Sequence, residues 1–176
     1  MSSRRTLPRL LPLAIAFVGL VVATTPVQAQ VAYIYRAWMS GSEVVPPTPS
    51  SGTGAVEGTF SVGEFWCTDS PDHVLRTFGN YGGLSGPPTG CHMHRGAAGV
   101  NGERLYTIFD GFFPPNWPLA AVAINPDDCA DLDTRNIYVV ITTDLYPEGE
   151  VRAQVVAEQA GPVESTTWGS IKSVYR

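Results

Sequence analysis

Short apolar runs separated by turn-forming clusters dominate the chain from about residue 31 to residue 157. The runs are rich in Val, Ile, Thr, Tyr and Phe, and the clusters between them are rich in Gly, Pro, Ser and Asp. Short runs of this composition at regular spacing predict an all-β protein, either a β-sandwich or a barrel. We expect strands near residues 31–39, 53–62, 73–81, 89–95, 103–110, 119–124, 136–143 and 149–157.

The N-terminal residues follow the order of a secretory signal peptide. Three arginines between residues 4 and 9 precede an apolar run over residues 10–23, and Val27-Gln28-Ala29 then supplies small residues. This pattern predicts a signal peptide over residues 1–29, a domain over residues 30–160, and export to the periplasm or the extracellular space. The alternative is a transmembrane anchor, which needs about 20 apolar residues. No later stretch approaches that length, so we expect no membrane span in the mature protein.

The last residues, 161–176, have a different pattern from the rest. Trp168, Ile171 and Val174 recur at helical spacing after Gly161-Pro162. This spacing predicts a short C-terminal helix that docks on the β-domain. The alternative is that the tail attaches the protein to a partner, which would make it a structural or surface-associated module.

Charge narrows the classes of partner. The full chain has a formal net charge of −5, and the expected signal peptide carries three arginines and no acidic residue, so the mature protein is close to −8. Nucleic acids and anionic membrane surfaces are bound through basic patches. The composition therefore argues against both, and an unknown protein or small ligand is the expected partner.

In the strand expected at 89–95, the alternation of side chains predicts that Cys91 lies on the opposite side from the two histidines. Cys91 and Met93 share one face and should point into the core, whereas His92 and His94 share the other. Export places the three cysteines in an oxidising space. With Cys91 inward, Cys67–Cys129 is the favoured disulfide, and Cys91 as a thiolate metal ligand is the alternative.

Two imidazoles on one strand face are a candidate metal site. His92 and His94 would supply two ligands, and imidazole suits copper and zinc. A third ligand must come from elsewhere, and His73 is the remaining histidine in the chain. Oxygen donors are the other option, at Asp144, Glu148 or Glu150. The alternative is that His92 and His94 hold loops in place through hydrogen bonds.

Four local patterns occur in the order expected of the CHRD (chordin-type) domain family. They are Met39-Ser40-Gly41-Ser42-Glu43-Val44-Val45-Pro46-Pro47, Tyr81-Gly82-Gly83-Leu84-Ser85-Gly86, the segment Cys91-His92-Met93-His94 that continues to Asn101-Gly102, and Tyr138 to Thr143 followed by Pro147 to Gln154. Over about residues 35–157 the chain resembles an exported bacterial member of that family. The resemblance implies an immunoglobulin-like antiparallel β-sandwich or barrel, distantly similar to the copper/zinc superoxide dismutases.

The same resemblance makes copper the expected metal, but three positions depart from the family pattern. Arg95 and Ala153 stand where glycine is usual, and Thr142 stands where a third histidine is expected. Because Thr142 replaces that histidine, the copper site that the resemblance implies lacks one of its expected ligands.

A second set of polar residues follows the strand expected at 149–157. Glu150, Arg152 and Gln154 alternate with apolar residues and should form one polar face. If that face adjoins the histidines, Arg152 or Arg95 would steer an anionic ligand, with Glu150 beside them. The alternative is a salt-bridged sheet surface.

The functional expectation combines these features. The chain contains no G-x-S-x-G, phosphate-binding glycine loop or H-E-x-x-H motif. We therefore expect an exported, non-enzymatic binding module that uses one sheet face. The alternatives are a copper-binding protein with dismutase-like redox chemistry and a structural module.

Overall fold

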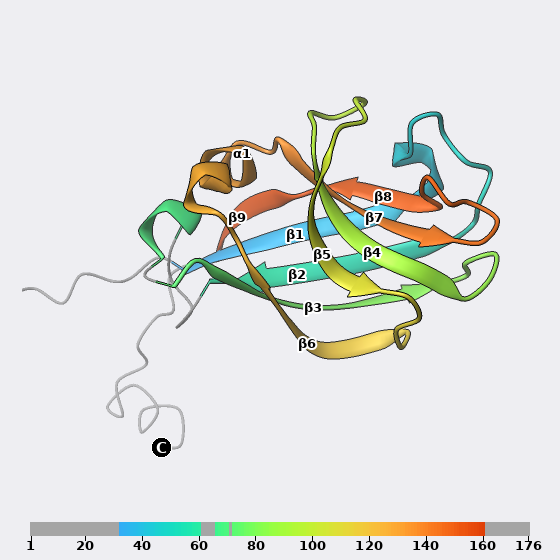
Figure 1. The fold of residues 1–176 in the computed structure, drawn as a ribbon, viewed down its shortest axis with the longest axis horizontal. Helices are drawn as coiled ribbons and strands as arrows, with labels where there is room; N and C mark the ends of the chain where they lie inside the picture. Colours follow the sequence, from blue (N-terminus) through green and yellow to red (C-terminus); the bar gives the residue numbers. More distant parts are fainter. Residues whose placement is uncertain (1–31, 61–65, 71, 161–176) are drawn as a thin grey trace, which may run out of the picture.

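The computed structural model describes residues 32–60, 66–70 and 72–160 (Figure 1). The signal peptide expected at 1–29 and the helix expected in the tail at 161–176 lie outside the described residues. Within the described part of the chain, no helix has both the length and the apolar character needed to cross a membrane.

The described residues form an all-β fold, as the sequence predicted. The strands are β1 (Ala32–Ser40), β2 (Thr53–Thr59), β3 (Val74–Gly82), β4 (Pro88–Arg95), β5 (Arg104–Asp110), β6 (Asn116–Ala123), β7 (Ile137–Thr143), β8 (Val151–Gln154) and β9 (Val156–Ala160). Three short 3₁₀ helices, η1 (Gly41–Glu43), η3 (Cys67–Asp69) and η4 (Pro126–Asp128), and one helix, α1 (Cys129–Asp133), connect them. The strand expected at 149–157 is divided, because β8 ends at Gln154 and β9 begins at Val156.

All the strands belong to one antiparallel sheet. Its order is β5-β4-β7-β8-β1-β2-β3-β6, and β9 pairs with β1 beside β8. The sheet curls until its two edges, β5 and β6, come into contact, so that the sheet is nearly closed and barrel-like (Figure 1). Strand β1 therefore lies in the middle of the sheet, with β8 and β9 on one side and β2 on the other.

Strand alternation determines which side chains fill the inside of this sheet. On β1 the inward residues Tyr35, Ala37 and Met39 are each 2% exposed, whereas Trp38 points outward and is 64% exposed. The inward apolar residues of the other strands form a single core with them. Burying this apolar surface is the main force that holds the sheet closed.

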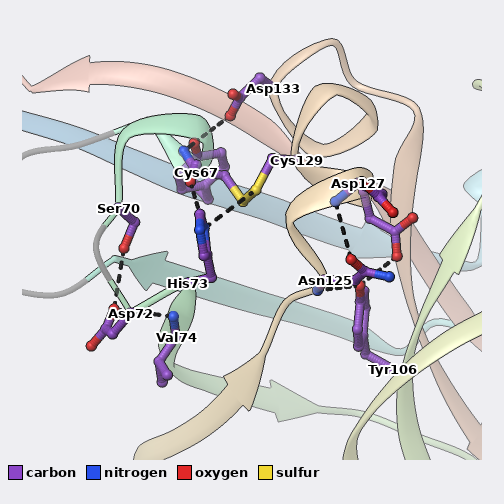
Figure 2. The surroundings of a disulfide bond; sticks show 12 residues. Cys67, Ser70, Asp72, His73, Val74, Tyr106, Asn125, Asp127, Cys129 and Asp133 are labelled. Carbon is purple, nitrogen blue, oxygen red and sulfur yellow. Dashed lines mark hydrogen bonds between the residues drawn. A yellow bond between two sulfur atoms is a disulfide. The ribbon is translucent and has the colours of Figure 1, made fainter.

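A disulfide fastens one end of the barrel. Cys67 in η3 is bonded to Cys129 at the start of α1, as the sequence predicted, and the two half-cystines are fully buried (Figure 2). Cys91 is a buried free thiol on the core side of β4. Burial raises the pKa of the Cys91 thiol, so it stays protonated and behaves as a small apolar residue.

Candidate functional site

The two histidines of β4 lie side by side on the outer face of the sheet. Cys91 and Met93 point into the core at 0% and 1% exposure, and the rings of His92 and His94 occupy the opposite side with centroids 6.4 Å apart. The structure thus brings together the pair that the sequence singled out. What each ring can do depends on its neighbours.

His92 is covered and its Nε2 atom already has a partner. The side chain is 7% exposed, and Nε2 accepts a hydrogen bond from Arg104 Nη1 at 3.1 Å. Gly90 allows this pose, because a Cβ on Gly90 would lie 2.3 Å from Cε1 of the ring. Burial, followed by the positive charges of Arg104 and His94, lowers the pKa of His92, although Asp110 opposes this. The ring is therefore a neutral acceptor for Arg104.

His94 holds the loop that follows β4. Its Nδ1 atom lies 3.1 Å from the carbonyl oxygen of Gly102, and its ring stacks on Tyr138 with centroids 5.1 Å apart. Burial lowers the pKa of His94, the hydrogen bond to Gly102 opposes this, and Arg104 and Arg152 lower it further. A neutral ring that donates from Nδ1 satisfies the Gly102 carbonyl.

Arg152 and Gln154 on β8 hold the same loop from the other side. Arg152 Nη2 donates to the Val100 carbonyl oxygen at 2.9 Å, and Nη1 donates to Asn101 Oδ1 at 3.0 Å. The guanidinium also stands 3.5 Å from the centre of the Tyr138 ring. Gln154 Nε2 donates to the Gly96 carbonyl oxygen at 2.7 Å. These residues of the family pattern therefore act as anchors for residues 96–102.

The three histidines do not form one metal site. His73 lies beside the disulfide, with Nδ1 3.1 Å from the Cys67 carbonyl oxygen and 3.9 Å from Cys129 Sγ (Figure 2). Within the described ranges, Cys67, His73 and Cys129 are the set of three metal-type ligands close enough to share an ion, and its two sulfur atoms are joined in the disulfide.

The residues around His92 and His94 also do not fit copper. A metal at His92 Nε2 would take the place of the Arg104 hydrogen bond and face a cation. Thr142, in the place of the third histidine, contacts Thr89 through its hydroxyl at 2.9 Å. A hydroxyl is a poor copper ligand compared with imidazole, so no chemistry is derived through a metal here.

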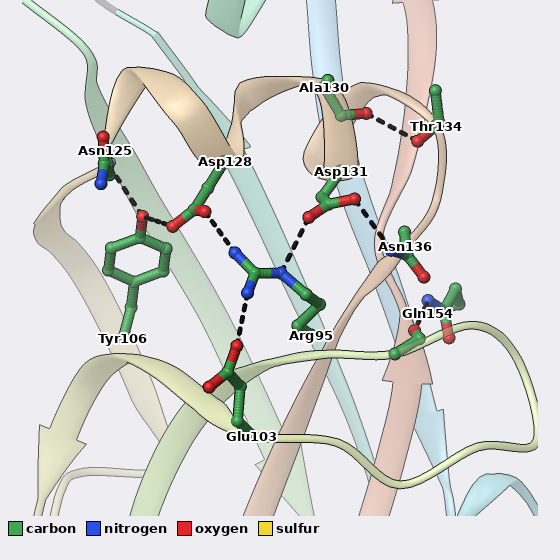
Figure 3. Close-up of polar contacts among 11 residues, drawn as sticks. Arg95, Glu103, Tyr106, Asn125, Asp128, Ala130, Asp131, Thr134, Asn136 and Gln154 are labelled. Carbon is green, nitrogen blue, oxygen red and sulfur yellow. Dashed lines mark hydrogen bonds and ion pairs between the residues drawn. The ribbon is translucent and has the colours of Figure 1, made fainter.

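Arg95 is committed to a network of acids. Its guanidinium forms ion pairs with Glu103, Asp128 and Asp131, and Nε reaches Asp131 Oδ2 at 2.8 Å (Figure 3). Tyr106 donates to the other oxygen of Asp128, and burial with this hydrogen bond raises the pKa of Tyr106 to about 12. Arg95 thus ties β4 to η4 and α1, and its charge is balanced within the protein.

The structure corrects the predicted place of Glu150. This residue precedes β8 and is 0% exposed, so it does not extend the polar face formed by Arg152 and Gln154. Its carboxylate accepts hydrogen bonds from Ser50, Ser85 and Thr143 at 2.6–2.7 Å. Burial raises the pKa of Glu150, but these hydrogen bonds outweigh it and the pKa is lower than usual. The carboxylate joins loops and is not accessible to a ligand.

The outer face of β1 carries a groove that sequence reasoning missed. It has a volume of about 250 Å³, and we call it the Trp38 groove; it is lined by Arg36, Trp38, Ser40, Glu43, Ala153, Gln154, Val156 and Glu158. A signal for it exists in the sequence, because Trp38 falls in the outward register of β1, between Arg36 and Ser40. An aromatic residue at an outward position of a strand is a candidate binding residue.

The groove is assembled from three strands and the turn after β1. Arg36 is held between two carboxylates, with Nη1 2.6 Å from Glu158 Oε2 on β9 and Nε 3.6 Å from Glu57 Oε1 on β2. Glu43 in η1 makes no hydrogen bond or ion pair with another described residue. The groove therefore combines an exposed indole with fixed polar groups of both charges.

Comparison with known proteins agrees with the sequence patterns. The family model of the CHRD domain matches residues 35–155, which run from within β1 to the end of β8 and include the anchored loop. No curated protein and no solved structure matches the chain. Because the match spans more than half of the chain, this protein belongs to the CHRD domain family.

Proposed function

We propose that this protein is a non-enzymatic binding module whose ligand occupies the Trp38 groove on the outer face of β1. One observation carries the proposal: Trp38 is 64% exposed in a groove lined by polar side chains. A large apolar side chain held in water costs free energy that a bound ligand recovers. The other candidate residues, His92, His94 and Arg95, are already used by hydrogen bonds or ion pairs within the protein.

We also propose that the protein acts after export, as a domain over residues 30–160 released from a signal peptide over residues 1–29. The support is the order of charge, apolar run and small residues at the N-terminus, together with the Cys67–Cys129 disulfide. Disulfides persist in the periplasm and outside the cell and are rare in the cytosol of most organisms. The proposed ligand is a component of the envelope of the producing cells.

The test is retention on envelope material. Purified protein is sedimented with envelope fragments from the producing cells, and the bound fraction is compared for wild type, Trp38→Ala and Phe112→Ala. Phe112 is 73% exposed in the connection between β5 and β6, outside the groove, so it is a matched control. We expect Trp38→Ala to lose retention and Phe112→Ala to keep it. Equal retention of all three proteins, or none by wild type, would refute the proposed function.

A further inference from the structure

We infer that the ligand of the Trp38 groove is a carbohydrate, an uncharged oligosaccharide that stacks one sugar ring on the indole of Trp38. The inference rests on the proposed binding face and names the chemistry of its ligand. It follows from three features of the groove: the exposed indole, the mixed set of hydrogen-bonding groups, and the continuation of the face across β2 to β3.

The indole of Trp38 is placed as a stacking platform. In the sheet register Trp38 is opposite Ala55 on β2, and Ala55 is opposite Asn80 on β3. The indole is 64% exposed beside this small residue, so most of its surface is open to solvent. The C–H groups on one side of a pyranose ring pack well against such a π-face, and aromatic residues supply large apolar contact area with a polar edge.

The polar groups of the groove match hydroxyl groups. A sugar hydroxyl is both a donor and an acceptor, so it needs both kinds of partner close together. Glu43 and Glu158 offer carboxylate oxygens, and Ser40 offers a hydroxyl. Arg36 adds a guanidinium that is held by a hydrogen bond from Nη1 to Glu158 and by an ion pair with Glu57. A guanidinium fixed in this way loses little conformational entropy when it binds a hydroxyl.

The same face continues beyond the groove. Phe78 on β3 is 42% exposed and shares the outer face with Asn80, two residues along the strand. Strand β3 is two strands from β1, a lateral distance of about 10 Å. A single sugar ring cannot contact both aromatic residues at that separation, whereas an oligosaccharide can. The ligand is therefore a chain of sugars that crosses the strands.

Charge separates this ligand from the other classes of partner. Carboxylates of Glu43, Glu57 and Glu158 lie in or beside the groove, and the mature protein is strongly acidic. Nucleic acids and sulfated or uronic polysaccharides would be repelled. The centres of protein–protein interfaces are depleted in charged residues, whereas here charged side chains surround the one aromatic residue of the groove.

The experiment is affinity electrophoresis of the native protein in gels that contain one soluble polysaccharide each. The neutral probes are a mixed-linkage β-glucan, hydroxyethylcellulose, xylan, galactomannan and dextran, and alginate is the anionic probe. Wild type, Trp38→Ala, Trp38→Phe and Phe112→Ala are run side by side, after circular dichroism has shown that each variant keeps the β-fold.

We expect at least one neutral polysaccharide to retard the wild type and alginate not to do so. Trp38→Ala should weaken this binding by about tenfold to hundredfold, because aromatic stacking of a flat ring is lost. Trp38→Phe should weaken it less, and Phe112→Ala should leave it unchanged.

Three results would overturn the inference. They are no retardation by any neutral polysaccharide, retardation that is the same in Trp38→Ala, and retardation by alginate in place of the neutral probes. If envelope fragments still retain the protein through Trp38 while every polysaccharide fails, and protease treatment of the fragments abolishes retention, the ligand is a protein. In that case the proposed binding function is correct and the inference of a carbohydrate ligand is wrong. If envelope retention and affinity electrophoresis both fail, the proposed function and the carbohydrate inference are both refuted.

Discussion

The buried carboxylate of Glu150 provides the sharpest test of how this fold is held together. It is 0% exposed, faces no cation within hydrogen-bond reach in the described part of the chain, and accepts four hydrogen bonds from Ser50, Ser85 and Thr143. Through these bonds it joins the segment before β2 and the loop before β4 to the end of β7. Glu150→Gln removes the negative charge and keeps a polar side chain of the same size, whereas Glu150→Ala removes the hydrogen-bonding group altogether. Comparing the two variants separates the contribution of the charge from that of the hydrogen bonds.

The expected cost follows from the hydrogen bonds. Glu150→Gln keeps the shape, but its amide nitrogen cannot accept hydrogen bonds, so the Ser85 and Thr143 hydroxyls that donate to Oε2 must turn and accept from the NH₂ group. Loss of the negative charge weakens each of the four contacts by roughly 1 kcal/mol. Because the neutral amide costs less to bury than the carboxylate, we expect a net loss of about 1–3 kcal/mol in the free energy of unfolding. Glu150→Ala removes all four hydrogen bonds, leaves the buried Thr143 hydroxyl without this acceptor and opens a cavity, so we expect about 3–5 kcal/mol.

The effect of Glu150→Gln should depend on pH in a defined direction. The pKa of Glu150 in the folded protein is below its ordinary value of 4.5. The carboxylate therefore stabilises the fold fully above the unfolded pKa, and this stabilisation disappears as the pH falls through the lower folded pKa. The stability difference between wild type and Glu150→Gln should be constant from pH 7 to about pH 5 and should shrink below that.

Urea unfolding followed by tryptophan fluorescence measures these differences, and the buried Trp117 reports on the core. Glu148→Gln is the control, because Glu148 is an exposed carboxylate two residues away and its loss should change stability by less than about 0.5 kcal/mol. If Glu150→Gln is as stable as wild type at pH 7, the burial cost of the charge equals or exceeds its hydrogen bonds. The reasoning above would then be wrong.

Two further predictions concern the disulfide and the histidine pair. The Cys67–Cys129 bond closes a loop of 62 residues, so replacing both cysteines by serine should lower the free energy of unfolding by about 4 kcal/mol in urea titrations; a loss below 1 kcal/mol would mean that the unfolded chain is already constrained there. Titration with Cu(II) should show no stoichiometric uptake that depends on His92 and His94, because Arg104 occupies His92 Nε2 and Gly102 holds His94. One tight equivalent in wild type, lost in the double alanine variant, would contradict this, whereas Arg104→Gln with Thr142→His should gain uptake.

The alternation of apolar and polar residues was sufficient to predict most of the strands. Strand formation, and the side of the sheet on which each side chain lies, depend mainly on the residue types that are adjacent in sequence. The outward and inward sides of β4 were predicted from Cys91 and Met93 alone, and the choice of Cys67–Cys129 followed. The division between β8 and β9 was not predictable in this way, because the run near Val155 is continuous in sequence. Strand β8 ends just before Val155, whose N–H donates to the Ile137 carbonyl oxygen, and the next residues pair with β1 as β9.

What the sequence by itself determined is therefore the class of fold, the family and the inward side of β4, since these depend on local periodicity and on residue type. It favoured the Cys67–Cys129 disulfide, which the structure contains. The use of the polar residues was decided only by tertiary structure. Arg104 reaches His92 and four hydrogen bonds reach Glu150 because of strand order and register, which no local pattern encodes. The Trp38 groove shows this most clearly, because Arg36 and Glu158 lie 122 residues apart and meet only when β9 pairs with β1.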